Sequence, residues 1–205
     1  QTSPDKKSAK INLGLDKDKQ TVIYASGAYG AKTDKKHVKE LFFGNLDANV
    51  VIICGKNQNL YDYCNSLVSE NNLKNVYVVG FTNNMFEYLR ASDLFLGKSG
   101  SNSMLEAYYF GVPTFITACA NPLETEIAKY YINKMGCGKM VLSPKKMIKE
   151  VKEYLANPVE REKYQKNLEI YCDLTGAERL ADILYQTLKN KLNSQNCGEG
   201  ENCER

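Results

Sequence analysis

The sequence predicts an α/β protein: a Rossmann-like, doubly wound parallel sheet of about six strands with helices on both faces. Two observations lead to this fold class. Short apolar runs alternate with helical patterns along most of the 205 residues. The runs are continuously apolar, as expected for parallel strands that are covered on both faces. Ligands of such sheets bind beyond the carboxyl ends of the strands, so the loops at that edge are the first place to search for function.

Each predicted element follows from a run or from a capping signal. The candidate strands are residues 21–25, 50–54, 76–79, 94–96, 113–119 and 139–142. The expected helices are residues 34–43, 58–70, 85–91, a helix from about 103, and residues 123–134, 144–156, 158–172 and 177–192. Ser143-Pro144 and Asn157-Pro158 are strong start signals, because each puts a capping residue before a proline in the first helical turn.

The two ends of the chain differ from its middle. Residues 1–19 are polar and lysine-rich without a clear period, which predicts a linker from a preceding domain. Residues 20–192 are predicted to form the folded, ligand-binding domain, and residues 193–205 a flexible tail. Because the sequence begins with Gln1, we expect it to be a piece of a longer protein.

Composition bears on several classes of function. Hydrophobic content of 43% and charged content of 25% are those of a globular domain, and a net charge of +3 argues against a nucleic-acid partner. Seven cysteines without a CxxC pair predict a reducing, cytoplasmic compartment without disulfides. No metal site is expected: His37 stands alone on a helix expected to be exposed, and Asp16-Lys17-Asp18 precedes a buried strand, which favours a solvated turn.

The most informative stretch runs from Ser92 to Ala107 and predicts a strand, a glycine–serine turn and a helix. A helix start exposes backbone N–H groups and suits a phosphate, and Gly100 would let a ligand approach the backbone. Side-chain donors follow at Ser101, Asn102 and Ser103. The same residues also fit a capping box between Ser103 and Glu106, and this structural interpretation is at least as good for the stretch alone.

A second small-residue turn, Ser26-Gly27-Ala28-Tyr29-Gly30, follows the first strand. Its GxxG pattern is neither the dinucleotide fingerprint nor the phosphate loop. In the doubly wound order 3-2-1-4-5-6, however, strands one and four are neighbours. The two turns would then face one anionic ligand from two sides, which favours a phosphate-bearing ligand.

Several blocks, in order, resemble the carboxyl-terminal, donor-binding half of a GT-B glycosyltransferase. The similarity is greatest to the monogalactosyldiacylglycerol synthase group and to the related lipid-linked N-acetylglucosaminyltransferase of peptidoglycan synthesis. It spans about residues 20–190. The matching blocks are VIICGKN at 51–57, VGFTNNM at 79–85, ASDLFLGKSG at 91–100, LEA at 105–107 and GVP at 111–113.

The resemblance implies a UDP-sugar as donor substrate and no cofactor. It would place Glu106 at the ribose hydroxyls, and Leu123 and Glu124 at the sugar. The remaining donor-binding positions would be Ser101, Asn102 and Ser103 at the pyrophosphate, Gly27, Ala28, Gly30 and Gly100 along the phosphates, and Phe81, Thr82 and Met85 at the uracil. Leu123 and Ile127 stand where relatives often carry polar sugar contacts, which leaves the identity of the sugar open.

The implied activity is metal-independent transfer of a hexose to a lipid acceptor such as diacylglycerol, at the membrane in the full-length protein. The acceptor site and the general base would lie on an amino-terminal domain or on a separate chain. Three alternatives stay open at this point. They are a stand-alone donor-binding subunit that needs a partner chain, an isomerase of the UDP-sugar 2-epimerase kind, and a binding module with a degenerate donor site.

Overall fold

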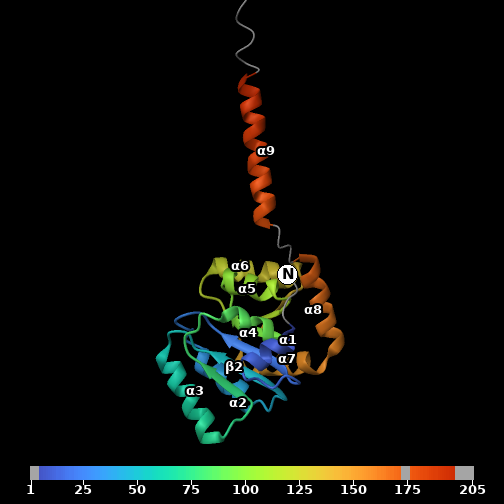
Figure 1. Ribbon diagram of the computed structural model, residues 1–205. Helices are drawn as coiled ribbons and strands as arrows, with labels where there is room; N and C mark the ends of the chain where they lie inside the picture. Colours follow the sequence, from blue (N-terminus) through green and yellow to red (C-terminus); the bar gives the residue numbers. More distant parts are fainter. Residues whose placement is uncertain (1–4, 172–175, 197–205) are drawn as a thin grey trace, which may run out of the picture. The chain divides into compact units, whose positions relative to one another are not determined.

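The computed structural model describes residues 5–171 and 176–196 (Figure 1). Contacts divide the chain into two units, one that runs from α1 to α8 and one that contains α9. The first unit holds the sheet and all of the predicted donor-binding residues, and it is described first.

Six parallel strands form one sheet in the order β3-β2-β1-β4-β5-β6, which confirms the predicted fold class and places strands one and four side by side. The strands are β1 Gln20–Ala25, β2 Ala48–Ile53, β3 Val76–Val79, β4 Leu94–Lys98, β5 Thr114–Ala118 and β6 Gly138–Met140. The central strands β1 and β2 are buried almost throughout, because helices cover both of their faces.

Helices pack on both faces of the sheet (Figure 1). One face is covered by α2 Asp34–Phe43, α3 Gln58–Asn71 and α7 Pro144–Ala156. The other face is covered by α1 Lys6–Asn12, α4 Met85–Ala91, α5 Ser101–Tyr109 and α6 Pro122–Lys129, with the π-helical turn η1 Tyr130–Lys134. Helix α8 Pro158–Tyr171 joins both cores, with Tyr164 in the first and Leu168 in the second.

Helix α1 lies within the segment that the sequence predicts to be a linker. Ala9 and Leu15 are buried in the same core as α4, and the Asp5 side chain accepts a hydrogen bond from the Lys7 N–H at 3.3 Å. The pattern gave no signal because a seven-residue helix has room for few apolar positions, and its one large apolar residue, Ile11, is exposed.

Helix α9 Gly176–Asn196 forms the second unit and begins one residue before the predicted helix. It extends into the predicted tail as far as Asn196, and the rest of that tail, residues 197–205, lies outside the described residues. The apolar side chains Leu180, Ile183, Leu184 and Leu188 are exposed. None of the helices in the described ranges has the length and apolar content to cross a bilayer.

The seam between β1 and β4 positions the candidate site. The two strands stay paired up to Ala25 and Gly97, so the turns that follow them leave the sheet from neighbouring positions. A Cβ atom at Gly97 would collide with the carbonyl oxygen of Ala25, which explains a glycine inside a buried strand. Beyond Gly97 the pairing of β4 with β5 shifts by one residue at Thr117, an irregularity of the kind that often lies next to active sites.

Candidate functional site

A buried carboxylate holds the first turn, residues 26–30, in place. The buried Asp34 carboxylate accepts hydrogen bonds from the Ser26 hydroxyl at 2.6 Å, the Ala31 N–H at 2.6 Å and the Tyr24 hydroxyl at 2.7 Å. Burial and then the Asp34 charge raise the pKa of Tyr24, so its phenol stays protonated and donates. Sequence reasoning missed this role of Asp34, because a carboxylate at the start of a helix is an ordinary capping signal.

The loop after β2 holds the same turn from the side. The Lys56 N–H donates to the Ala28 carbonyl at 2.7 Å, and the Asn57 amide donates to the Tyr29 carbonyl at 3.3 Å. Gly27 has a φ of 85°, in the left-handed region that favours glycine, and a Cβ atom there would meet nothing within 4 Å. The bulky Tyr29 side chain is 78% exposed, so it does not fill the turn.

The second turn, residues 99–103, does not form the capping box that was the structural alternative to a ligand site. Helix α5 begins at Ser101 with Gly100 as its N-cap, and no side chain caps it. The capping box between Ser103 and Glu106 is therefore absent, because the helix starts earlier than predicted and Ser103 already lies in its first turn. Within residues 5–171, the N–H groups and side chains of 101–103 and the Glu106 carboxylate have no hydrogen-bond partner. These groups can bind an anionic, hydroxyl-bearing ligand.

The space above the second turn is open. A Cβ atom at Gly100 would meet only the Lys98 Cε atom, at 3.9 Å. The φ of Gly100 is −68°, which any residue can adopt, so neither strain nor packing within the protein requires glycine here. A glycine that the protein's own packing does not need is consistent with close approach of a ligand to the backbone.

Lys98 is the main residue of this site that sequence reasoning missed. Its ammonium lies 3.3 Å from the Glu124 carboxylate, which also accepts hydrogen bonds from the Ala120 N–H at 2.9 Å and the Ser99 hydroxyl at 3.3 Å. Burial alone would raise the pKa of Glu124, but these donors and the Lys98 charge hold it below its ordinary value. Its partner Glu124 lies far along the sequence, so no local pattern marks Lys98.

Glu124 is positioned by the start of α6. The Asn121 side chain caps this helix by accepting a hydrogen bond from the Glu124 N–H at 2.9 Å. The carboxylate is thereby turned toward the end of β4. Leu123, the other residue predicted to contact the sugar, is 70% exposed.

The residues predicted to contact the base lie at the same edge of the sheet, after β3. Phe81 is 58% exposed, and the Lys56 ammonium lies 5.5 Å from the centroid of its ring. The Thr82 hydroxyl accepts a hydrogen bond from the Asn84 N–H at 3.0 Å, and Met85 packs against the core. Phe81 is the exposed member of this group, whereas Thr82 and Met85 are half-buried.

His37 was expected to be exposed, and this expectation is wrong. It is fully buried, because α2 turns Asp34, His37, Val38 and Leu41 toward the sheet. Its two ring nitrogens lie 3.0 Å from the Thr33 carbonyl oxygen and 3.2 Å from the Leu142 carbonyl oxygen. It packs α2 against the segment before α7 and does not reach the turns.

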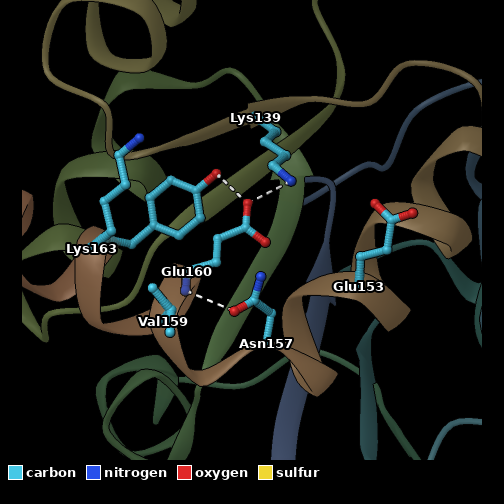
Figure 2. Close-up of a pocket in the computed structure, with 7 residues that line it drawn as sticks. Lys139, Glu153, Asn157, Val159, Glu160 and Lys163 are labelled. Carbon is cyan, nitrogen blue, oxygen red and sulfur yellow. Dashed lines mark hydrogen bonds and ion pairs between the residues drawn. The ribbon is translucent and has the colours of Figure 1, made fainter.

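A cavity of about 440 Å³ lies elsewhere, between β6, α7 and α8 (Figure 2). Two of its charged groups are paired: the Lys139 ammonium lies 2.7 Å from the carboxylates of Glu160 and of the neighbouring Glu150, and Tyr164 donates to Glu160. Burial alone would lower the pKa of Lys139, but the two carboxylates outweigh it and raise that pKa. These pairs fasten α7 and α8 to the edge strand, so we assign the cavity no part in donor binding. In the described part of the chain, no cluster of three or more His, Cys, Asp or Glu side chains could hold a metal ion.

Comparison with known proteins supplies the family. A model of the glycosyltransferase family 28 C-terminal domain matches residues 25–183. The chain belongs to this family. Among curated proteins, a processive diacylglycerol beta-glucosyltransferase of Staphylococcus aureus strain Newman is 31% identical over 152 residues, which is 74% of this chain and 38% of that protein. The chain thus spans well under half the length of this relative.

Several solved structures share the fold of this domain at low sequence identity. A putative UDP-N-acetylglucosamine 2-epimerase from Listeria monocytogenes superposes with a TM-score of 0.68 at 16% identity, covering 88% of this chain and 47% of that one. MurG from Acinetobacter baumannii gives a TM-score of 0.65 at 15% identity, covering 90% and 54%. WaaG, a glycosyltransferase involved in lipopolysaccharide biosynthesis, gives 0.64 at 19% identity, covering 88% and 51%. Together with the family match, these structures bear out the resemblance to the donor-binding half of a GT-B glycosyltransferase.

Proposed function

We propose that this chain is the nucleotide-sugar-binding half of a UDP-sugar-dependent glycosyltransferase that transfers a hexose to a lipid acceptor such as diacylglycerol. The observation that carries the proposal is the pair of small-residue turns that leave β1 and β4 side by side, with open space at Gly27 and at Gly100. Family membership supports sugar transfer, and the printed name of the staphylococcal relative supports a diacylglycerol acceptor.

In this proposal the diphosphate of the donor lies between the two turns. The backbone N–H groups and side chains of Ser101, Asn102 and Ser103 hold it from α5, and the turn at Gly27, Ala28 and Gly30 closes on it from β1. Within residues 5–171, the protein itself makes no hydrogen bond to the N–H groups and side chains of 101–103. The positive end of the α5 dipole favours the same anion.

The rest of the donor follows from the order of the strands. Glu106 lies just over one turn into α5, where its unpartnered carboxylate accepts hydrogen bonds from the ribose hydroxyls. The uracil stacks against Phe81 beyond β3. The hexose extends toward α6, where Glu124 and Leu123 line its path.

The proposed reaction is an in-line displacement at the anomeric carbon with inversion of configuration. An acceptor hydroxyl forms the new glycosidic bond, UDP leaves, and a general base takes the hydroxyl proton. This chain contributes to the departure of UDP, because the N–H groups of α5 and the Lys98 ammonium stabilise the negative charge that develops on the diphosphate. The acceptor site and the base belong to an amino-terminal domain or to a separate chain.

The other interpretations have less support. The fold is shared with UDP-N-acetylglucosamine 2-epimerases, but the sequence identities are only 16% and 19%, so this similarity supports a common fold and not a common reaction. The family match is to a glycosyltransferase domain. A degenerate donor site would be expected to fill its turns with its own side chains. Asp34 and Asn57 occupy the space at Gly30, but the space at Gly27 and at Gly100 is open.

Calorimetric titration tests donor binding by this chain. We expect UDP to bind more tightly than UMP, because UMP lacks the second phosphate, and more tightly than ADP, because the base differs. Folded protein that shows no heat of binding at millimolar UDP would overturn the proposal.

A second experiment tests the reaction in the full-length protein. Incubation with radiolabelled UDP-hexoses and diacylglycerol vesicles should give a labelled glycolipid and an equal amount of UDP. An isomerised UDP-sugar without any glycolipid would instead support the epimerase alternative.

A further inference from the structure

Lysines gather on the solvent side of two neighbouring helices, α2 and α7, in the layer opposite α5. The helices pack together directly, since Gly44 at the end of α2 abuts Ile148 and His37 approaches the Leu142 carbonyl. The lysines of this face, called here the lysine face, are Lys32, Lys35, Lys36, Lys39, Lys145, Lys146, Lys149 and Lys152, and all are exposed.

Carboxylates do little to neutralise the lysine face. On the same two helices, Asp34 points inward to Tyr24 and Ser26, and Glu150 is paired with Lys139. Glu153 lies 3.7 Å from Lys149 at an exposed position, and Glu40 is half-buried. Within the described ranges, the other lysines of the face form no ion pair; Lys35 lies over the Tyr63 ring. Since the whole chain carries a net charge of only +3, its positive charge is concentrated here.

Helix stability does not explain where these lysines stand. Lys35 and Lys36 lie in the first turn of α2, and Lys145 and Lys146 lie in the first turn of α7. Cations at helix amino termini oppose the helix dipole and destabilise the helix. The first turn of α7 carries no acid, and the acid in the first turn of α2, Asp34, is buried and bound to Tyr24 and Ser26. An arrangement that costs stability points to selection for a charged partner.

We propose that the lysine face docks on an anionic lipid bilayer, an inference that rests on the proposed lipid acceptor. Juxtamembrane lysines are attracted to anionic lipid surfaces through charge alone, without a shaped pocket. Leu142 is 49% exposed immediately before α7 and offers an apolar contact among the lysines. The face begins at the carboxyl edge of the sheet, and Lys32 follows closely after Gly30 of the first donor turn. Docking there brings the bilayer surface to the edge where the hexose is transferred.

The composition of the face favours a bilayer over a nucleic acid. Helices α2 and α7 contain lysines but no arginine. Nucleic-acid sites usually add arginine forks. Lysine is a compact point charge, which suits a diffuse layer of lipid headgroups.

Vesicle sedimentation with the 205-residue chain tests the proposal. The variant carries Lys36→Gln, Lys39→Gln, Lys145→Gln and Lys146→Gln. The matched control carries Lys7→Gln, Lys17→Gln, Lys74→Gln and Lys163→Gln, which are exposed elsewhere and give the same net charge. Wild type should bind vesicles that contain phosphatidylglycerol and not vesicles of phosphatidylcholine alone. The variant should lose about 100-fold in partitioning, while the control loses no more than about threefold.

The outcomes separate this proposal from its alternatives. Binding that vanishes in about 1 M salt, where the Debye length is about 3 Å, would support an electrostatic contact. An equal loss in variant and control would overturn the proposal, because net charge alone would then account for binding. Tighter binding to single-stranded RNA than to phosphatidylglycerol vesicles would also overturn it. Titration of the same variants with UDP distinguishes this proposal from the proposed donor site. The lysine-face variant should bind UDP as the wild type does. A wild type that does not bind UDP would count against the donor site only.

Discussion

Polar groups at the amino edge and at the carboxyl edge of the sheet differ in whether the protein itself supplies their partners. At the amino edge, the Asp93 carboxylate is engaged on every side by the protein: the Lys6 ammonium at 2.8 Å, the Lys10 ammonium at 3.2 Å and the Thr21 N–H at 2.8 Å. At the carboxyl edge, the donors at the start of α5 and the Glu106 carboxylate have no partner in residues 5–171. Both edges are polar, but only one has binding capacity left over.

This difference teaches how to separate structural from functional polarity. Buried polar groups in folded proteins are almost always satisfied, so the Asp93 cluster needs no ligand to explain it. It fastens α1 to the sheet, and the Tyr154 hydroxyl adds a contact from α7 by donating to the Asp93 carbonyl at 2.8 Å. The open turns beyond β1 and β4 instead combine small residues with unused donors, which fits a site completed by an anion.

The largest expected effect is on stability, at the amino edge. Asp93→Asn should lower the free energy of unfolding by about 3 kcal/mol, because the substitution leaves the buried Lys10 ammonium without its counter-charge. Urea unfolding measures this effect. The matched control is Asp47→Asn, which removes an exposed pair with Lys19 and should leave the free energy of unfolding almost unchanged. If folded Asp93→Asn protein bound UDP more weakly than the wild type, the assignment of a purely structural role to the amino edge would be contradicted.

The next effect is on binding, at the carboxyl edge. Glu106→Gln should weaken UDP binding by about 2 kcal/mol, because the ribose hydroxyls lose a charge-assisted acceptor, with stability unchanged within about 0.5 kcal/mol. Calorimetry and urea unfolding measure the two quantities. Glu70→Gln, at an exposed position on α3, is the control and should change neither. A Glu106→Gln protein that is destabilised but binds UDP normally would show that Glu106 stabilises the fold and does not contact the ribose.

A smaller effect is expected at Lys98. Its side chain is 33% exposed, so solvent screens its charge, and Lys98→Met should weaken UDP binding by about 1 kcal/mol. Binding of UMP should be unaffected if the ammonium acts at the second phosphate. Lys129→Met, at an exposed pair on α6, is the control. Equal losses for UDP and UMP would show that Lys98 acts through the fold of the turn.

The smallest effect is a pH dependence from the amino edge. Burial alone would raise the pKa of Asp93, but Lys6, Lys10 and the Thr21 N–H outweigh it and hold the pKa below its ordinary value of 3.8. A depressed pKa means that the ionised carboxylate stabilises the fold above 3.8 and that this contribution is lost as the pH falls through the folded-state value. The free energy of unfolding of the wild type should therefore decline slightly below about pH 4, whereas that of Asp93→Asn should decline less. Equal slopes for the two proteins would contradict this assignment.

Much of the fold was predictable, because its signals are local and repeated. Continuous apolar runs such as 50–54 can be buried only between two layers, and together with the alternation of elements they predict a parallel sheet. Signals that depend on distant partners were not predictable. Helix α1 owes its place to a salt bridge with Asp93, far along the chain, and the burial of His37 depends on the segment before α7.

The candidate site shows the same division. The two turns and their adjacency follow from glycine and serine positions plus one topological rule. The roles of Lys98 and Asp34 do not, because each becomes visible only when its partners, Glu124 and the first turn, are placed in space. The donor contact of every predicted site residue, from Gly27 to Glu124, stays a prediction.

Amide chemical-shift mapping by NMR during a UDP titration tests the central claim most directly, since it observes both edges of the sheet in one experiment. The account predicts large, saturable shifts at residues 27–30 and 99–106, smaller ones near Phe81, and none around Asp93, Lys6 and Lys10. Shifts that cluster at the amino edge, or in the cavity beside Lys139, would contradict it.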